Sequence, residues 1–347
     1  MKRLKSLLRC YPAVLLSAAI CLGATLCLAA VSRLVWYDAR PTLLLVGDCS
    51  VDNFRFWPGR RIHELVEAAD PAMRVYNVAE PGALPGDLYP LAAKAALAVG
   101  RPTHVVIGLE ADRFVIDPSA PRLMYSGRQL RWLPLLSVTS WKYFAELTPS
   151  EMAIAILQRG SEFFYLAGDK VVDAWLRQVQ WPQFRKSILE NPESPELVLD
   201  KSRRWAAQMD TARVWNRAGI DSLQRAVDFR TALELFRRDG ARTVVVLLPY
   251  GNHDLIARTH TPSSQAKVDS LEVAMRRFLE STGVDFIDMA SPTERGNFPD
   301  SVWYDQMNIG RPEPFFRIAQ AIGHWRRGEA DAALVGSSNL AERETNR

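Results

Sequence analysis

Cysteine is scarce in this chain of 347 residues, and its placement limits what the thiols can do. Three of the four cysteines lie within the first 38 residues, so Cys49 is the only one in the remainder. A lone thiol has no intramolecular disulfide partner, so it is either buried and inert or kept for its reactivity. The five histidines are scattered singly, without the spacing of metal ligands. The sequence therefore predicts no metal and no other cofactor.

An excess of basic residues is also missing once the N-terminus is set aside. The formal net charge is +4, and Lys2, Arg3, Lys5 and Arg9 account for all of it. The rest of the chain is neutral and offers no basic surface for nucleic acid. No glycine-rich phosphate loop is present either, which argues against nucleotide binding.

An uncharged apolar run, Tyr11–Ser32, follows the basic N-terminus. About 20 such residues cross a bilayer as a helix, and the preceding basic residues hold the N-terminus in the cytoplasm. A cleaved signal peptide is the alternative, since the small residues Ala29 and Ala30 would permit cleavage. The run is long for a signal core, so we favour an uncleaved single-pass anchor in the inner membrane. In both cases the chain after Asp38 is exported to the periplasm.

Short apolar runs alternate with helical patterns beyond residue 38. The expected strands are 43–46, 74–78, 104–108, 243–248 and 284–287, and the expected helices are 60–69, 88–99, 265–281 and 313–327. This alternation is typical of a three-layer α/β/α fold of the flavodoxin-like kind, with a five-strand parallel sheet. The apolar and charged fractions, 48% and 24%, are ordinary for a globular domain.

The expected domain spans residues 39–327, after a cytoplasmic stub and anchor in residues 1–38. From about residue 118 to 240 the pattern is mostly helical and rich in tryptophan. An insertion of this length is typically a lid, a cap subdomain or a partner surface. Most of its aromatic residues are expected to pack it onto the core, and a minority are candidates for lining a sugar-binding cleft. Residues 328–347 are small, polar and charged, which predicts a disordered tail.

Polar residues follow each expected strand, at the edge where an open parallel sheet binds its ligands. Asp48, Cys49 and Ser50 come after the first strand, where the alternative is a turn in which Ser50 or Asp52 caps the next helix. Gly82, Glu110 and His253 follow the later strands, and Asp305 and Asn308 lie near the C-terminus. His253 is a candidate base, with an ordinary polar loop residue as the alternative.

In this order, the motifs resemble those of the SGNH, or GDSL, hydrolase superfamily over about residues 43–323. Its members carry a nucleophilic serine after Gly-Asp at the first strand. A glycine and an asparagine after the second and third strands bind the oxyanion, and Asp-x-x-His precedes the last helix. Pro249-Tyr250, Trp303-Tyr304-Asp305 and Arg311-Pro312-Glu313 are similar to a membrane-anchored exported branch. That branch includes proteins of exopolysaccharide O-acylation and of teichoic acid D-alanylation.

The resemblance implies acyl transfer, but this chain departs from the pattern at several positions. Cys49 stands at the position of the family's serine, and Ser50 follows it. Gly82 and Asp305 match the family's glycine and aspartate. Glu110 stands in place of the asparagine, and Asn308 stands in place of the histidine. An ionised Glu110 would repel an oxyanion, and only its protonated form could donate a hydrogen bond. An amide is not a useful base, so Asn308 leaves the triad degenerate.

The expected function is O-acyl transfer or ester cleavage on an exported polysaccharide, with Cys49 or Ser50 as nucleophile. The alternative is a non-catalytic domain that binds glycan or serves as an accessory subunit of an exopolysaccharide acylation or secretion complex. The expected partners are a polysaccharide or acylated glycan and, through the anchor, the inner membrane. A membrane-bound O-acyltransferase is a further candidate partner.

Overall fold

The computed structural model describes six stretches of the chain and three single residues near its N-terminus. The stretches are residues 40–47, 62–79, 83–115, 195–299, 313–329 and 335–336. Ala19, Gly23 and Cys27, from the expected anchor, are helical and exposed, and the rest of that segment lies outside the described residues. Among the residues described, no helix combines the length and the apolar character that a membrane crossing requires. The anchor therefore stays a prediction.

A six-stranded sheet forms the centre of the described structure. In spatial order its strands are β2 (Arg74–Asn77), β1 (Thr42–Val46), β3 (His104–Glu110), β4 (Arg242–Leu248), β5 (Asp285–Asp288) and β6 (Val335–Gly336). The first five pair in parallel, and β6 pairs antiparallel with β5. The order β2-β1-β3-β4-β5 is that of flavodoxin-like sheets. It confirms the expected five-strand parallel sheet.

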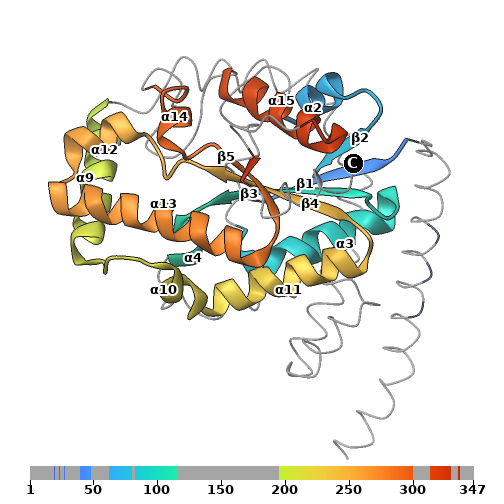
Figure 1. The fold of residues 1–347 in the computed structure, drawn as a ribbon, viewed down its shortest axis with the longest axis horizontal. Coiled ribbons are helices and arrows are strands. Elements are labelled where there is room, and N and C mark those ends of the chain that lie inside the picture. Colours follow the sequence, from blue (N-terminus) through green and yellow to red (C-terminus); the bar gives the residue numbers. More distant parts are fainter. Residues whose placement is uncertain are drawn as a thin grey trace, which may run out of the picture.

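Helices cover both faces of the sheet (Figure 1). They are α2 (Ile62–Ala69), η1 (Pro85–Asp87), α3 (Leu88–Val99), α4 (Asp112–Val115), α9 (Pro195–Thr211), α10 (Arg217–Asp221), α11 (Gln224–Arg238), α12 (His253–Thr259), α13 (Pro262–Thr282), α14 (Pro292–Arg295) and α15 (Glu313–Arg327). α2 and α15 pack together on one face, while α3, α11 and α13 cover the other. α9 packs on α12 and α13 at the side where β3 and β4 end.

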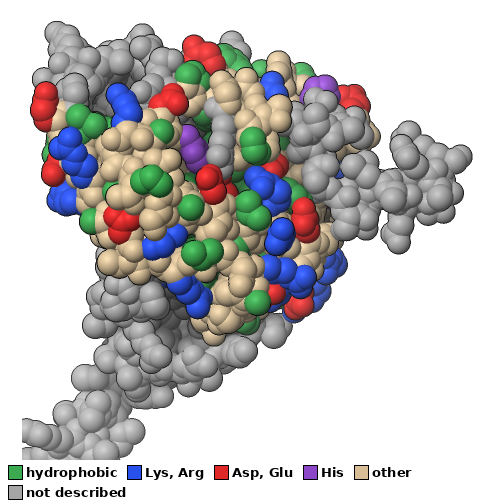
Figure 2. Space-filling view, turned by 60° about the vertical axis from the view of Figure 1, so that its left-hand side comes forward, with side chains coloured by type: hydrophobic (Ala, Val, Ile, Leu, Met, Phe, Trp, Pro, Cys, Tyr) green, Lys and Arg blue, Asp and Glu red, His purple; other side chains and the backbone are tan. Residues whose placement is uncertain are grey.

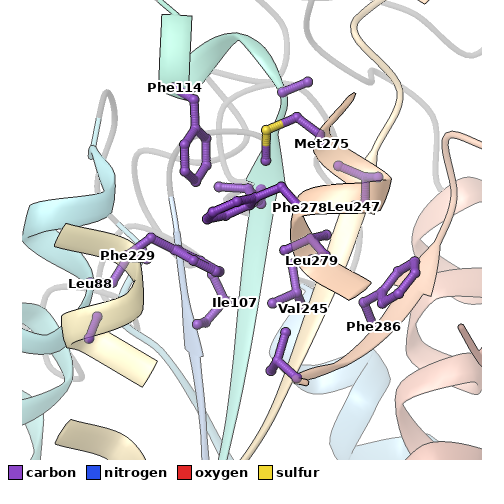
Figure 3. Close-up of a cluster of buried hydrophobic side chains, with 14 of the residues drawn as sticks. Leu88, Ile107, Phe114, Phe229, Val245, Leu247, Met275, Phe278, Leu279 and Phe286 are labelled. Atoms are coloured by element: carbon purple, nitrogen blue, oxygen red, sulfur yellow. The ribbon is translucent and has the colours of Figure 1, made fainter. Parts of the chain in front are cut away.

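Side chains of the strands alternate between these two helical layers. Leu44 and Val46 of β1 belong to the core beneath α3, α11 and α13, whereas Leu43 and Leu45 belong to the core beneath α2 and α15. Successive side chains of a strand point to opposite faces, so a sheet covered on both sides requires continuous apolar runs. Figure 3 shows the first of these cores, where Phe278 of α13 lies beside Phe114 and above Ile107 of β3.

Most elements lie close to the ranges expected from the sequence, and the helices Leu88–Val99 and Glu313–Arg327 have the expected bounds. Several features differ, among them the short helices α4 and α14, which were not expected. α12 was not expected, and α11, within the range expected to be an insertion, packs on α3 and β4 as a covering helix of the sheet. Val335–Gly336 pairs with β5 although this tail was expected to be disordered. A two-residue strand is too short to leave a periodic signal in a sequence.

His104 begins β3 at the opposite edge of the sheet from the predicted site. Its ring meets the Trp325 ring edge-on, with centroids 5.7 Å apart. Burial, assisted by the nearby charges of Arg242 and Arg326, lowers the pKa of His104 to about 4. The ordinary value in an unfolded chain is about 6.5, so between these two values the unfolded chain binds the extra proton. The contribution of this histidine to stability is therefore complete above pH 6.5 and is lost as the pH falls toward 4.

We expect acidification from pH 7 to 4.5 to destabilise the parent more than His104→Gln. The difference should be roughly 1–2 kcal/mol, once solvent screening of this half-buried ring is allowed for. Urea unfolding of both chains at the two pH values measures it. Equal pH slopes in the two chains would contradict the assignment to His104.

Candidate functional site

The structure describes Glu110 and His253 among the predicted site residues. Those outside the described residues are Asp48, Cys49, Ser50, Gly82, Asp305 and Asn308. Glu110 ends β3, and His253 begins α12 just beyond β4, so both lie at the carboxyl edge of the sheet. β1 leaves the sheet at the buried Gly47 beside β3, at this same edge. That all the predicted site residues lie together at this edge of the sheet stays a prediction.

Glu110 is buried and paired with an arginine. Its Oε2 accepts a hydrogen bond from Nη2 of Arg113 at 3.2 Å, and the Glu110 side chain is 6% exposed. Arg225 in turn donates to the backbone carbonyl of Arg113 at 3.3 Å. A carboxylate in an ion pair accepts hydrogen bonds and has no proton to donate. This pairing argues against Glu110 as an oxyanion donor.

The turn after β4 fixes the start of α12. Gly251 has a φ of +112°, a value that favours glycine over residues with a Cβ. Asn252 is buried, and its Oδ1 accepts a hydrogen bond from the backbone N–H of Leu255 at 3.0 Å. This is the usual N-cap contact of a helix. His253 is therefore the first residue of a capped helix that begins directly at the edge of the sheet.

His253 contacts a buried carboxylate on α13. Its Nε2 lies 3.0 Å from Oε1 of Glu272, and the two side chains are 23% and 1% exposed. The same Oε1 accepts a hydrogen bond from the backbone N–H of Tyr250 at 2.9 Å. Because a carboxylate only accepts hydrogen bonds, Nε2 of His253 carries the proton. Nδ1 is then the nitrogen of the neutral ring that can take up a proton.

The backbone beside this pair is held by an aromatic stack. Trp205 of α9 stacks on Tyr250, with centroids 5.0 Å apart and ring planes 23° apart. The Tyr250 side chain is buried, and its backbone N–H bonds Glu272. A further contact, this one between α9 and α12, joins the hydroxyls of Ser202 and Thr259 at 2.7 Å. Packing of α9 thus stabilises the turn that presents His253.

Sequence reasoning missed Glu272, although its position in α13 gives a signal. The buried apolar residues Val268, Met275 and Leu279 share a helical stripe, and Glu272 lies within that stripe at i+4 from Val268. An acid within an apolar stripe needs a buried partner, because an unpaired buried carboxylate is costly. Its partner, His253, comes from a different element, so the pairing depends on the tertiary fold.

Figure 2 shows the side of the molecule that carries α9, α12 and α13. Acidic, basic and hydrophobic side chains are interspersed on this face. Mixed charge of this kind agrees with the neutral balance of the sequence beyond its N-terminus. The described part of this face therefore shows no broad area of a single charge sign.

No family model matches the chain, and no curated protein sequence matches it. The solved structures similar to this chain include three at 11–13% identity. A catalytic mutant of the acetylxylan esterase Axe2 from Geobacillus stearothermophilus aligns at 11% identity and a TM-score of 0.37, over 82% of this chain and 93% of that one. A GDSL-like lipase from Parabacteroides merdae aligns at 12% and 0.35, over 81% and 96%. A second Axe2 mutant, described as an acetyl-xylooligosaccharide esterase, aligns at 13% and 0.35, over 82% and 93%.

Of these three structures, the one from Parabacteroides merdae is described as GDSL-like, the class that the sequence motifs resemble. The strand order and the parallel pairing by themselves show a flavodoxin-like α/β fold. Because their TM-scores lie below 0.5, these alignments carry no functional reasoning. The residues at the carboxyl edge of the sheet provide its basis instead.

Proposed function

We propose that this chain is an exported SGNH-like protein that acts in O-acyl transfer or ester cleavage on a polysaccharide, with a degenerate triad. One observation carries the proposal. The strands β1, β3 and β4 are parallel neighbours, and a histidine paired with a buried carboxylate follows β4 at their common carboxyl edge. The predicted nucleophile turn follows β1 toward that edge.

Cys49 or Ser50 is the proposed nucleophile, and the backbone near Gly82 is the proposed oxyanion site. In such chemistry a thiol or hydroxyl attacks the ester carbonyl, and backbone N–H groups stabilise the negative oxygen. Asp305 matches the orienting acid of the superfamily, but Asn308 stands where its base would be. A thiol partly escapes the need for a base, since a few per cent of it is ionised at neutral pH.

The proposed location is the inner membrane, with the main domain in the periplasm. The uncharged run Tyr11–Ser32 and its basic N-terminal flank support this proposal. A polysaccharide or acylated glycan and a membrane-bound O-acyltransferase are the proposed partners. Reporter fusions after Asp38 test the location, and a cytoplasmic signal would contradict it.

Turnover of a simple aryl acetate by the full chain tests the function. We expect weak hydrolysis that rises toward alkaline pH and depends more on Cys49 than on Ser50, because the thiol ionises more readily. Initial rates of the parent, Cys49→Ala and Ser50→Ala measure this. Vigorous hydrolysis that Ser50→Ala abolishes and Cys49→Ala leaves intact would contradict it.

A non-catalytic glycan-binding or accessory role is the second candidate. Two substitutions favour it, namely Asn308 at the position of the base and the ion-paired Glu110 at the position of the oxyanion asparagine. The two candidates differ in one measurement. The accessory role predicts retention of a polysaccharide by the full chain together with no ester turnover above that of Cys49→Ala.

A further inference from the structure

We propose that His253, held by Glu272, is the proton-accepting group of this site and takes the place of the base missing at Asn308. The inference rests on the proposed function, because it assigns a residue to that reaction. His253 is the proposed catalytic residue. Glu272 acts through it and is a positioning residue.

The first argument is geometric. One carboxylate oxygen of Glu272 holds both the Nε2 of His253, at 3.0 Å, and the backbone N–H of Tyr250, at 2.9 Å. The imidazole is thereby fixed to the end of β4 by a side chain from a different helix. The Tyr250 N–H holds the carboxylate in place, and the carboxylate in turn orients the ring through its one hydrogen bond to Nε2, which is what a positioned base requires.

The second argument is electrostatic. Glu272 is almost fully buried, and the His253 side chain is 23% exposed, so the pair has an inaccessible acid and an accessible imidazole. A carboxylate hydrogen-bonded to one imidazole nitrogen fixes the tautomer and stabilises the imidazolium that forms when the other nitrogen takes a proton. No hydrogen bond joins Nδ1 of His253 to any of the described residues. That nitrogen is the proton acceptor in this proposal.

The third argument comes from the other histidines of the chain. His104 lies at the opposite edge of the sheet, and burial lowers its pKa to about 4. His260 is buried at the end of α12, and burial lowers its pKa as well. His324 pairs with Glu329 at 2.9 Å, but these side chains are 42% and 51% exposed. His63 lies on α2, which covers one face of the sheet. His253 is partly exposed, pairs with a buried carboxylate and lies at the carboxyl edge of the sheet.

In the proposed reaction, His253 accepts and returns each proton, and Glu272 holds its ring. The attacking O–H or S–H adds to the ester carbonyl carbon, the new bond forms, and its proton passes to Nδ1 of His253. The carbonyl electron pair moves to oxygen. When the tetrahedral intermediate collapses, the bond to the alcohol oxygen breaks, that oxygen takes the proton back from Nδ1, and the acyl group stays on the nucleophile. Water or an acceptor hydroxyl then attacks the acyl group and gives its proton to Nδ1. The bond to the nucleophile breaks, and the nucleophile regains the proton from Nδ1. Glu272 stays ionised throughout, because its role is to stabilise the imidazolium.

The experiment measures kcat and KM for aryl acetate hydrolysis by the full chain and by three variants, His253→Ala, Glu272→Gln and the double variant. His253→Ala should lower kcat by about 10²–10⁴-fold with little change in KM. Glu272→Gln can keep both hydrogen bonds through its amide oxygen and removes the charge. It should lower kcat by about tenfold, since a charge-assisted hydrogen bond is about twice as strong as a neutral one.

Two readouts separate positioning from a structural role. Added imidazole should restore part of the turnover of His253→Ala, because the truncated, partly exposed site can admit it, and should not restore that of Glu272→Gln. The double variant should be no slower than His253→Ala, because Glu272 acts through the ring that is already absent. Glu329→Gln is the matched control. It neutralises the acid of the exposed His324 pair and should leave kcat unchanged.

Each outcome is decisive. If the parent hydrolyses the ester and His253→Ala stays within about twofold of it, the assignment of His253 is overturned while the proposed function stands. If Glu272→Gln slows the His253→Ala chain as much as it slows the parent, the positioning role is overturned. No turnover by the parent would overturn the proposed function and the pair's role together. Thermal unfolding of every variant shows whether a loss of rate comes from a loss of fold.

Discussion

Asn308→His should raise the turnover of a simple aryl acetate, most of all in a chain that also carries His253→Ala. A base within hydrogen-bond reach of the nucleophile is worth about 10²–10⁴-fold in rate, and an amide cannot take up a proton. The motif Asp-x-x-His of the superfamily puts its base at position 308, three residues after Asp305. In the His253→Ala chain, the new histidine should therefore increase kcat by about 10²-fold or more.

The control for this gain is Asn308→Gln, which changes the size of the side chain and keeps the amide. It should leave turnover at the level of its parent in both backgrounds. If a folded Asn308→His chain gains nothing in either background, the absence of a histidine at position 308 is not the main defect of the proposed triad. The accessory role would then be the better account of the chain.

Phe278→Ala should lower the free energy of unfolding by about 3–5 kcal/mol. The ring is fully buried in α13 (Figure 3), with its centroid 5.4 Å from that of Phe114 and 5.8 Å from that of Phe229. These rings come from α4, α13 and α11, so the substitution opens a cavity where three helices meet. Truncation costs both the transfer free energy of the ring and the contacts that line the cavity.

Phe316→Ala is the matched control for this prediction. It removes the same side chain from α15, where Phe316 is 48% exposed, and should cost less than about 1 kcal/mol. Urea unfolding of both variants measures the two losses. The shift in the midpoint urea concentration gives each loss, provided that the slope of the unfolding free energy against urea concentration is unchanged. Equal losses in the two variants would mean that the aromatic core beneath α13 does not limit the stability of the fold.

The fold could be predicted well from the sequence where the pattern is local. β4 is a continuous apolar run, and α15 has apolar positions at helical spacing that end in arginines, so each is defined by its own residues. α12 could not be predicted in the same way. It has seven residues and depends on the Asn252 cap and on packing against α9. Short helices of this kind are stabilised mainly by tertiary contacts.

The candidate site could be predicted only in part, for a related reason. Strand ends are visible in a sequence, so Glu110 was found at the end of β3 and His253 just beyond β4. Their partners were not. Arg113 follows Glu110 closely, yet only the turn into α4 brings the two charges together, and Glu272 reaches His253 from α13. A sequence shows which side chains end at an edge, while the fold decides what each one contacts there.

The pairing of β3 with β4 has a consequence for how the chain is made. These strands are neighbours at the centre of the sheet, and His104 pairs with Arg242. The ribosome must therefore synthesise α9, α10 and α11 before β3 and β4 can pair. Until then the nascent sheet exposes β3, a run of apolar residues from Val105 to Leu109, as an open edge. An unpaired strand edge can pair with strands of other chains, and strands that are far apart in the sequence pair slowly. A fragment that stops before β4 would therefore lack half of its central sheet, and it should aggregate and not persist as a small domain.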